Sequence, residues 1–349
     1  MPSTTSRASP SSADRSHVAQ NQAWTLASYP SGWVTEQNFK LVESPIPRPK
    51  DGEALVKNLW LSLDPYMRGR MSQQKSYVKG VEIGDVMTGE TAGEVVDSKH
   101  PKFKPGDTVT APSGWQLYCC LKGELLNKVD ASKVPLSYFL GCLGMPGRTA
   151  YFGLKDICAP KAGETVVVSA ASGAVGSVVG QLAKAWGCRA VGIAGGKAKC
   201  DYVVKELGFD ACVDYKAGNL FDDLKAACPK GVDACFENVG GEILDTVLRL
   251  MNVKSRIAIC GLISEYNATE PYGVKMFRSI LVNRIRVQGL IVFDWLERYP
   301  EGNQALLQLV LAGKLKTRES VLEGIGSAPR GLIGLLKGRN FGKQLVKLA

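Results

Sequence analysis

The stretch Glu164–Gly187, ETVVVSAASGAVGSVVGQLAKAWG, constrains the fold of this chain more than any other. Thr165–Val168 is an uninterrupted β-favouring run, which is typical of a strand buried on both faces. A small-residue turn, Ala171–Gly176, follows it and leads into a helix-like run. Strand, tight turn and helix form the context of a dinucleotide site. Glycine lets the backbone approach a pyrophosphate, and the helix N-terminus offers free N–H groups to its charge.

The glycine motif alone is a weak signal. The fingerprint is G-x-G-x-x-G, and Ala171 stands at its first position. An ordinary tight strand-to-helix connection gives a similar pattern. Gly176 and Gly180 lie about one helical turn apart, so we expect that face of the helix to sit tight against the sheet. The assignment therefore depends on the rest of the chain.

Length and charge limit the classes of function. The 349 residues leave room for about two domains, and no run is apolar enough to cross a membrane. The net charge is +10, and residues 311–349 hold eight basic and two acidic side chains. A solvated basic face explains this excess, and attraction of a polyanionic small ligand is the alternative. The basic residues are scattered without an aromatic platform, so we predict no nucleic-acid partner.

Cysteine usage and the first residues bear on the compartment. The ten cysteines include no C-x-x-C pair, and we interpret them, with the adjacent Cys119 and Cys120, as small buried thiols in a reducing compartment. We therefore expect a cytoplasmic protein. Residues 1–20 are rich in Ser, Thr and Pro and predict a disordered tail. Its Arg and Ser content leaves a targeting role open, although Asp14 and the lack of an amphipathic face argue against it.

Two patterns divide the chain. From Trp24 to about Leu125, short strand-like runs alternate with Pro and Gly turns, which indicates a compact, barrel-like β unit. From residue 164 strands alternate with helices, as in a doubly wound parallel sheet. The candidate strands are 189–194, 211–214, 232–237, 256–260 and 286–292, and the candidate helices lie near 198–207, 219–227, 241–251, 276–283 and 301–313.

Residues 319–349 return to short strands around a Gly-rich helix, so we expect the C-terminal segment to rejoin the N-terminal unit. The predicted fold class is α/β: a Rossmann-type doubly wound parallel sheet inserted into a mostly β, barrel-like domain. We expect 21–145 and 315–349 to form the β-rich catalytic domain. Residues 146–314 are expected to form the nucleotide-binding domain.

The end of the second strand bears on the choice of cofactor. In NAD-binding folds this strand ends in Asp or Glu, which binds the ribose 2′-OH. Here Arg189–Ala194 is followed by Gly195-Gly196-Lys197-Ala198-Lys199, with no carboxylate before Asp201. Two cations without an anion favour a 2′-phosphate, which predicts NADP over NAD. Each lysine taken singly is also compatible with a solvated helix start.

The string Leu59–Met71, LWLSLDPYMRGRM, carries a family resemblance together with ASGAVGSVVGQLAK, GGKAKC, FENVGGE and CGLISEYN. Over about residues 20–349 the chain closely resembles the zinc-independent branch of the medium-chain dehydrogenase/reductase superfamily. The branch includes prostaglandin and leukotriene reductases, plant alkenal double-bond reductases and bacterial curcumin reductase. The resemblance implies a GroES-like β domain and an NADPH-dependent reductase of C=C bonds conjugated to a carbonyl. It also implies a small-molecule enal or enone substrate and, usually, a homodimer.

The resemblance further implies roles for individual residues. The turn Ser172, Gly173, Ala174, Val175 and Gly176 matches the pyrophosphate loop, Lys199 the 2′-phosphate lysine and Tyr215 an adenosine-side tyrosine. Lys197 matches no position with an assigned role. The other positions expected along the cofactor cleft are Gly195, Asn238, Cys260, Gly261, Ile263, Tyr266, Leu290, Ile291, Val292 and Asn340.

A metal site is not expected. Zinc-dependent relatives carry a Gly-His-Glu motif where this chain has Gly89–Glu94, which lacks histidine. The chain holds only His17 and His100, neither in a metal-ligand spacing, and the structural-zinc cysteine cluster is missing. Alcohol oxidation, which relies in that branch on zinc to hold an alkoxide, is therefore disfavoured.

Two tyrosines are candidate catalytic residues. Hydride transfer to the β-carbon of an enone leaves an enolate, whose oxygen needs a hydrogen-bond donor and whose α-carbon needs a proton. Tyr66 follows the predicted strand 55–63, where zinc-dependent relatives place a cysteine ligand, and Tyr266 lies just past the predicted strand 256–260. The cofactor's ribose hydroxyl and water remain alternatives, and each tyrosine can instead pack its ring and bond to backbone. Arg68 and Arg70 are expected to hold structure.

Two other functions stay open. A quinone reductase of the same superfamily shares the nucleotide fold and the lack of zinc, although the Leu59–Met71 string favours the enone interpretation. A non-catalytic NADPH-binding protein, structural or RNA-associated, is compatible with the net charge of +10. The retained Tyr66 and Tyr266 argue against it.

Overall fold

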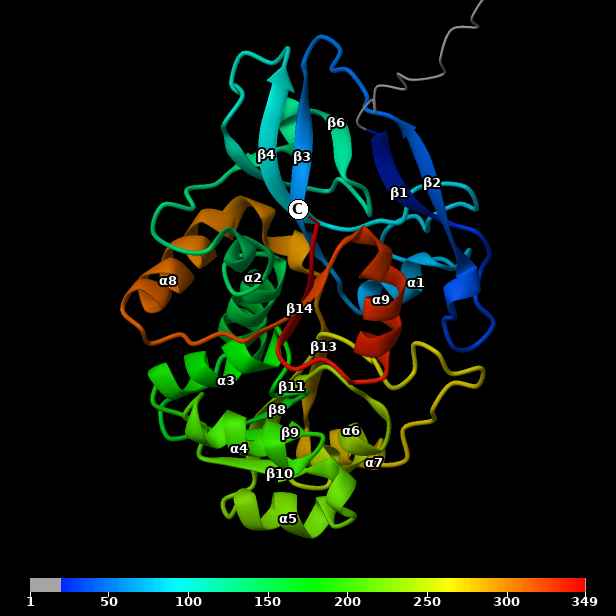
Figure 1. Cartoon of the computed structure of the whole chain (residues 1–349). Helices are drawn as coiled ribbons and strands as arrows, with labels where there is room; N and C mark the ends of the chain where they lie inside the picture. The colour runs from blue at the N-terminus through cyan, green and yellow to red at the C-terminus, as the bar shows by residue number, and fades with distance from the viewer. Residues whose placement is uncertain (1–19, 349) are drawn as a thin grey trace, which may run out of the picture.

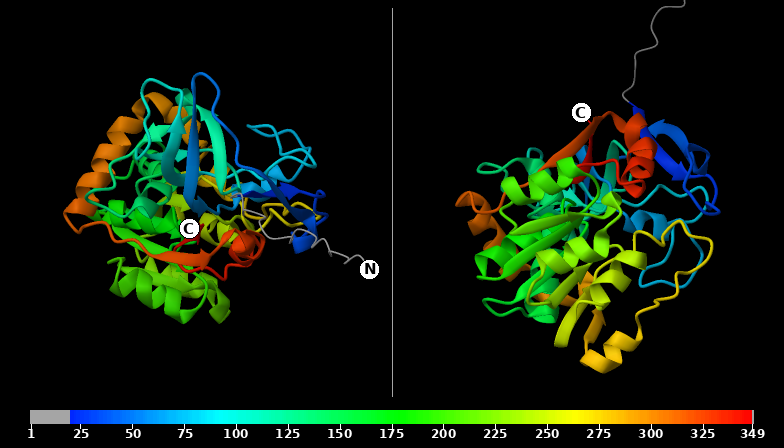
Figure 2. Two further views of the ribbon diagram at one scale, coloured as in Figure 1. Left: turned by 45° about the horizontal axis from the view of Figure 1, so that its top comes forward. Right: turned by 90° about the horizontal axis from the view of Figure 1, so that it is seen from below.

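The computed structural model describes residues 20–348 and arranges them in two lobes (Figure 1). The tail predicted for residues 1–20 lies outside the described residues except for Gln20, which begins strand β1. One lobe is mostly β, and the other is a parallel sheet flanked by helices (Figure 2). The prediction of a Rossmann-type sheet inserted into a mostly β unit is confirmed.

Six parallel strands form the sheet of the second lobe in the order β10-β9-β8-β11-β12-β13. The chain runs outward from β8 to β10 and then returns to the other side of β8 at β11, which creates the switch point where such sheets bind ligands. The strands are β8 (Thr165–Ser169), β9 (Arg189–Ala194), β10 (Ala211–Asp214), β11 (Val232–Glu237), β12 (Met251–Ile259) and β13 (Arg286–Gly289). The helices are α3 (Gly176–Ala185), α4 (Lys197–Lys205), α5 (Leu220–Ala227), α6 (Gly241–Leu248) and α7 (Arg278–Asn283).

Strand β8 is buried at every position, as its continuous β-branched run predicts. Val166 and Val168 pack in the core on the α3 side, while Val167 packs in the core on the α6 side. This alternation follows from the two-residue period of a strand. The central strand therefore joins two apolar layers and fixes the turn that follows it.

Two strand boundaries differ from the prediction. Strand β13 ends at Gly289 instead of residue 292, because its pairing with β12 ends at the Ile259–Gly289 pair and the chain then turns into a 3₁₀ segment at Val292–Arg298. Strand β12 begins at Met251 instead of residue 256. A register shift and a left-handed Lys254 (φ 61°) let the irregular start of β12 pair with β11.

The glycines of α3 allow close packing, although not in the way expected. A Cβ on Gly176 would lie 2.4 Å from the carbonyl oxygen of Ala170, so the turn after β8 requires glycine here. At Gly180 a Cβ would lie 1.8 Å from the ring of Phe209, which follows α4. The expectation that this face sits against the sheet was therefore wrong at Gly180, because a side chain from the α4–β10 connection occupies that space.

The β lobe combines both halves of the chain. Its main sheet has the order β14-β15-β3-β4-β5-β7, and β6 pairs with β3. Strand β15 runs antiparallel to β3, so the C-terminal strand completes a sheet begun near the N-terminus (Figure 1). The strands are β3 (Glu53–Ser62), β4 (Thr91–Ser98), β5 (Thr108–Ala111), β6 (Tyr118–Lys122), β7 (Asn127–Lys128), β14 (Glu319–Glu323) and β15 (Lys343–Lys347), with a separate pair β1 (Gln20–Leu26) and β2 (Phe39–Pro45).

Four further helices lie around the junction of the lobes. They are α1 (Tyr66–Arg70), α2 (Met145–Phe152), α8 (Tyr299–Leu311) and α9 (Ala328–Leu336). An isolated bridge joins Gly173 in the turn after β8 to Gly342 just before β15. Gly342 has a φ of 81°, and a Cβ there would lie 2.0 Å from the carbonyl oxygen of Arg318, so only glycine fits. Within residues 20–348, no helix has the length and apolarity needed to span a bilayer.

Candidate active site

A cavity of about 1700 Å³ lies between the two lobes. One wall is formed by the ends of strands β8, β9, β11 and β12, at the switch point of the parallel sheet. The facing wall comes from the β3–α1 turn, helix α2 and strand β15. This is the place where open α/β sheets bind nucleotides, and the volume is large enough for a dinucleotide and a second molecule.

The glycine-rich turn forms one part of this wall. Ser172, Gly173, Ala174, Val175 and Gly176 all line the cavity. Helix α3 begins at Gly176, so the positive end of its helix dipole lies at the cavity. The N–H groups of Ser177 and Val178 already donate within the turn, to the carbonyl oxygens of Gly173 and Val175. This turn therefore fits a pyrophosphate.

Helix α4, which follows β9, carries one of the predicted lysines in its first turn. Lys199 lines the cavity and donates from Nζ to the carbonyl oxygen of Gly338 at 2.8 Å. Burial, and secondly the nearby Lys216, hold the pKa of Lys199 below its ordinary value. Lys216 lines the cavity as well. A bound anion would relieve this repulsion, so the two cations together fit a 2′-phosphate.

The sequence left the role of Lys197 open, and the structure places this lysine away from Lys199. Lys197 is exposed and pairs with Asp201 at 2.6 Å, because the two residues lie four apart on one face of α4. Lys197 does not line the cavity. The second cation is Lys216, which follows Tyr215 in the DYK string. A Cβ on Gly195 would lie 2.9 Å from the Tyr215 ring, so glycine leaves room beside that ring.

The remaining residues predicted for the cofactor cleft all line the same cavity. Asn238 is fixed by a 2.8 Å hydrogen bond from Nδ2 to the carbonyl oxygen of Ser169, and Asn340 by one to the carbonyl oxygen of Gly342. Burial raises the pKa of the Cys260 thiol to about 12, so this thiol stays protonated. The cavity brings together Gly195, Lys199, Tyr215, Asn238, Cys260, Gly261, Ile263, Tyr266, Leu290, Ile291, Val292 and Asn340.

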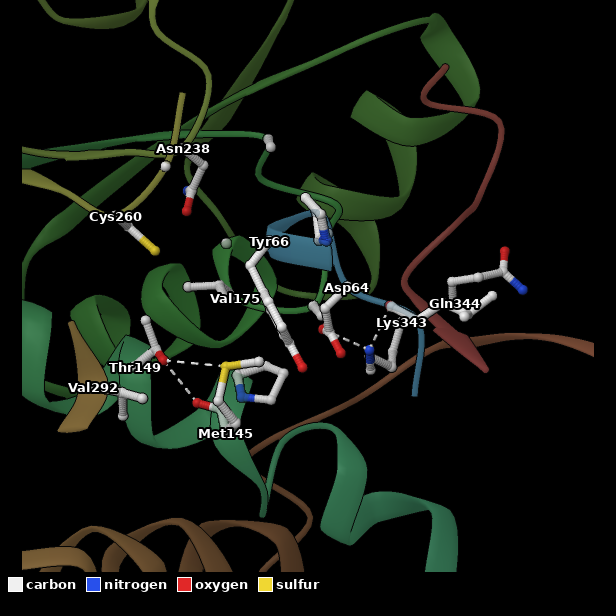
Figure 3. Close-up of a pocket in the computed structure, with 18 of the residues that line it drawn as sticks. Asp64, Tyr66, Met145, Thr149, Val175, Asn238, Cys260, Val292, Lys343 and Gln344 are labelled. Carbon is white, nitrogen blue, oxygen red and sulfur yellow. Dashed lines mark hydrogen bonds and ion pairs between the residues drawn. The ribbon is translucent and has the colours of Figure 1, made fainter. Parts of the chain in front are cut away.

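Both candidate tyrosines line the cavity. Tyr66 begins α1 and projects between Met145 and Asp64 in Figure 3. Burial, and then Asp64, raise the pKa of Tyr66 above its ordinary value. The hydroxyl of Tyr266 accepts from the N–H of Leu262 at 3.3 Å, and burial raises its pKa too. Both phenols therefore stay protonated and keep an O–H to donate.

Arg68 has the structural role expected of it. Its Nε donates to Oδ1 of Asn267 at 3.0 Å, and its Nη2 donates to the carbonyl oxygen of Gly32 at 2.9 Å. The guanidinium of Arg70 lies 4.7 Å from the ring centre of Tyr77 and 5.6 Å from that of Tyr66. These contacts hold α1 and its neighbouring loops at the edge of the cavity.

Sequence reasoning missed a buried ion pair beside Tyr66. Nζ of Lys343 lies 2.8 Å from Oδ1 of Asp64 and donates to the carbonyl oxygen of Leu63 at 2.8 Å. The hydroxyl of Ser62 donates to the same Asp64 carboxylate. The lysine and aspartate side chains are only 2% and 7% exposed. Figure 3 shows the two side chains pointing toward each other. They lie 279 residues apart in the sequence, so no local spacing pointed to them.

A second residue that the sequence did not reveal is Glu90. In the sequence it was only one position of the stretch Gly89–Glu94, which lacks the histidine of a zinc site. Glu90 lines the cavity, and burial raises its pKa to about 7. The positive charges of Arg148 and Lys343 lower the pKa of Glu90, and the negative charge of Asp64 raises it. This carboxyl therefore changes charge near neutral pH inside the cavity.

The raised pKa of Glu90 predicts a pH-dependent stability. Between its ordinary value of 4.5 and about 7 the folded chain binds more protons at Glu90 than the unfolded chain. The free energy of unfolding therefore falls as the pH rises through this window, by roughly 1–3 kcal/mol. We expect Glu90→Gln to stabilise the protein more at pH 8 than at pH 5. Urea unfolding at both pH values measures this.

The control for that experiment is Glu94→Gln, which removes an exposed carboxylate from β4 of the same segment. Its effect on the free energy of unfolding should be the same at both pH values. Parallel pH profiles for Glu90→Gln and the wild type would contradict a raised pKa at Glu90.

No metal site is built by the part of the chain that the structure describes. Among residues 20–348, no three or more His, Cys, Asp or Glu side chains gather where they could hold a metal ion.

A doubly wound parallel sheet inserted into a β domain, with a glycine-rich turn at the cleft, defines a two-lobed dinucleotide-dependent oxidoreductase fold. The family described as the N-terminal domain of oxidoreductase matches residues 22–129, and the zinc-binding dehydrogenase family matches residues 174–310.

Individual relatives match most of the chain. The NADPH-dependent curcumin reductase of Escherichia coli (strain K12) is 47% identical over 95% of this chain and 97% of its own length. The 2-alkenal reductase (NADP(+)-dependent) of Nicotiana tabacum is 43% identical over 94% of this chain and 98% of its own length. The crystal structure of CurA from Vibrio vulnificus in complex with NADPH has a TM-score of 0.89 and 47% identity, and covers 94% of this chain and 99% of CurA. The protein therefore belongs to the zinc-independent medium-chain dehydrogenase/reductase family of curcumin, alkenal and prostaglandin reductases.

Proposed function

We propose that the protein is an NADPH-dependent reductase of the C=C bond of α,β-unsaturated aldehydes and ketones. The observation that carries this proposal is one cavity lined by two cations, Lys199 and Lys216, and by two protonated tyrosines, Tyr66 and Tyr266. The first pair suits a phosphorylated dinucleotide, and the second suits an enolate. The named activities of the E. coli and tobacco relatives support the same chemistry.

The residues of this chain would hold the cofactor along one wall. Ser172–Gly176 would bind the pyrophosphate, Lys199 and Lys216 the 2′-phosphate, and Tyr215 the adenosine side. Asn238, Cys260 and Leu290–Val292 would surround the nicotinamide end. Bound NADPH supplies a hydride to the β-carbon of the substrate.

The tyrosines would act on the other end of the conjugated system. The hydroxyl of Tyr66 would donate a hydrogen bond to the carbonyl oxygen, where negative charge develops as the enolate forms. The hydroxyl of Tyr266, held by the Leu262 N–H, would orient the same region. Because both phenols have raised pKa values, each keeps its hydroxyl proton and remains a neutral hydrogen-bond donor toward the substrate.

A direct test is to follow NADPH absorbance with a panel of alkenals, enones, quinones and simple alcohols with NADP. We expect oxidation of NADPH by alkenals and enones, and saturated carbonyl products. Turnover of quinones alone would favour the quinone reductase alternative. Oxidation of alcohols with no activity on activated alkenes would contradict the proposal.

Lys199→Ala tests the choice of cofactor. Removing a charge-assisted hydrogen bond costs about 1.5–3 kcal/mol, so the Kd for NADPH should rise roughly 10–100-fold. The Kd for NADH, which lacks the 2′-phosphate, should change little. Fluorescence titration measures both, and Lys197→Ala on the same helix is the matched control. Equal affinity of the wild type for NADH and NADPH would contradict the assignment.

We also propose a homodimer formed through strand β13. This strand is the last of the parallel sheet, and all four of its residues are exposed. Exposed apolar side chains accompany it, with Leu281 of α7 78% exposed and Val287 of β13 43% exposed. An unpaired edge with apolar neighbours favours pairing with a second copy.

Charged substitutions at this edge test the dimer. We expect the double variant Leu281→Asp and Val287→Asp to sediment as a monomer in analytical ultracentrifugation. Val204→Asp, an exposed apolar position on α4, should leave the mass of the dimer unchanged. A monomeric wild type, or a double variant that remains dimeric, would contradict the proposal.

We also propose the limits of the two domains and a reducing compartment for the protein. The pairing of β15 with β3 supports a β domain made of 21–145 and 315–349 around a nucleotide domain of 146–314. All ten cysteines are unpaired, which supports a reducing compartment such as the cytoplasm. Six of them are buried, and Cys119, Cys120, Cys212 and Cys260 are half-buried instead of buried as expected.

A further inference from the structure

Arg148 is a guanidinium in the cavity without a counter-ion. It lies on α2 and lines the cavity, and its guanidinium carbon lies 4.4 Å from the ring centre of Tyr299. Its Nε is buried and has no hydrogen-bond partner. None of the ion pairs found between residues 20–348 involves Arg148. Since arginine stays charged in proteins, its charge is balanced only by a group that enters the cavity or by a distant carboxyl.

A second unsatisfied polar group lies near it. Asn303 lines the cavity, and its Oδ1 is buried without a donor. Asn303 is four residues after Tyr299 on α8, so both side chains lie on one face of that helix. The Tyr299 ring contacts Arg148. The face of α8 that carries Tyr299 and Asn303 therefore places Asn303 at the same end of the cavity as Arg148. Rotating the Asn303 amide by half a turn presents its NH₂ group as a donor.

Arg148 lowers the pKa of the Glu90 carboxyl, but the two side chains do not form an ion pair. No nitrogen of Arg148 lies within 4.0 Å of the Glu90 carboxylate. Besides Arg148, the charged groups that act on Glu90 are Asp64 and Lys343, which already pair with each other. Burial outweighs Arg148 and raises the pKa of Glu90 to about 7. An anion at Arg148 would favour protonated Glu90 further and would turn it into a donor.

We propose that Arg148, with Asn303 and Glu90 beside it, forms a subsite for a carboxylate at the far end of the substrate. The inference rests on the proposed function and specifies its substrate class: an enal or enone whose chain ends in a carboxylate. The guanidinium fork matches a carboxylate better than a neutral group, because it donates two parallel charge-assisted hydrogen bonds.

The placement of the subsite suits a chain of this kind. Arg148 is one turn of α2 beyond Met145, and Thr149 and Met145 line the cavity near Tyr66 and Val292 (Figure 3). The carboxylate would therefore bind away from the alkene, on the side of α8. The stripe Pro300, Asn303, Leu307 and Leu311 of α8 lines this end of the cavity and offers an apolar surface to the connecting chain.

The test compares an unbranched enal that ends in a carboxylate with its methyl ester, over several chain lengths. The measured quantity is the ratio of kcat/KM for the acid to kcat/KM for the ester. We expect Arg148→Gln to lower this ratio roughly 10–100-fold and Arg148→Lys, which keeps the charge without the fork, to lower it less. Lys314→Gln removes the same charge at an exposed position outside the cavity and should leave the ratio unchanged.

A binding measurement separates this inference from the proposed function. The saturated keto acid that corresponds to a carboxylate-ended enone has no C=C bond to reduce, and it is titrated calorimetrically into the wild type and into Arg148→Gln. We expect weaker binding to the variant and no such difference for the saturated ester. An acid-to-ester ratio that Arg148→Gln leaves unchanged, or equal binding of the keto acid to both proteins, overturns the subsite even when neutral enones are reduced. If no enone is reduced, the proposed function fails, and the keto-acid titration still decides the subsite.

Discussion

Tyr66→Phe is expected to lower kcat for an enone by about 100-fold or more, with a change in KM of only a few fold. The physical reason is that the lost O–H would contact the carbonyl oxygen mainly as its negative charge develops. Removing one such donor from an enzyme typically costs 10²–10³ in kcat. Steady-state rates of NADPH oxidation by an alkenal measure the effect.

Two further variants make the Tyr66 result specific. Tyr266→Phe should cost less, because the hydroxyl of Tyr266, which accepts from the backbone N–H of Leu262, is assigned to orienting the substrate and not to holding the enolate oxygen. Tyr118→Phe on β6, outside the cavity, is the matched control and should leave kcat unchanged. Full kcat in both single variants and in the Tyr66→Phe, Tyr266→Phe double variant would exclude both tyrosines as donors. An effect on KM alone would indicate positioning.

Lys343→Met is expected to destabilise the protein by about 3–5 kcal/mol, the largest effect on stability that the structure predicts. The substitution leaves the carboxylate of Asp64 buried without its cation, and the carbonyl oxygen of Leu63 loses its donor. The Asp64–Lys343 pair joins the C-terminal strand β15 to the turn that carries Tyr66, so activity should fall with stability. Chemical denaturation measures the free energy of unfolding.

The double variant Asp64→Leu, Lys343→Met separates charge from packing. Removing both charges relieves the unpaired carboxylate, so we expect it to recover most of the lost stability. Lys347→Met, at an exposed position of the same strand, should change the free energy of unfolding by less than about 0.5 kcal/mol. A single variant Lys343→Met as stable as the wild type would contradict the assigned ion pair.

The fold was predictable where one segment of sequence carries its own pattern. The run Thr165–Ser169 and the small-residue turn after it determine a buried strand and a tight turn locally, and the strand–helix alternation behind them indicates the parallel sheet. The end of β13 was not predictable, because Leu290–Val292 is wholly apolar and favours a strand more than the residues Arg286–Gly289 that form it. The strand ends there only because β12 offers no further partner.

The candidate site was predictable to the extent that the family motifs mark it. Every position predicted for the cofactor cleft lines one cavity. Lys216 was missed because local spacing cannot show that the segment after β10 reaches the end of β9. Sequence alone did not reveal four charged residues of the cavity, because their roles depend on burial and on partners far away in the sequence. These residues are Asp64, Glu90, Arg148 and Lys343.

The central claim is that hydride reaches the β-carbon of an activated alkene. The most direct measurement uses NADPH carrying deuterium at both positions of nicotinamide C4, an alkenal as substrate, and NMR of the product. The proposed chemistry predicts deuterium on the β-carbon of a saturated aldehyde whose carbonyl group is intact. Deuterium on the former carbonyl carbon, in an allylic alcohol, or no transfer from NADPH to any alkenal or enone, would contradict it.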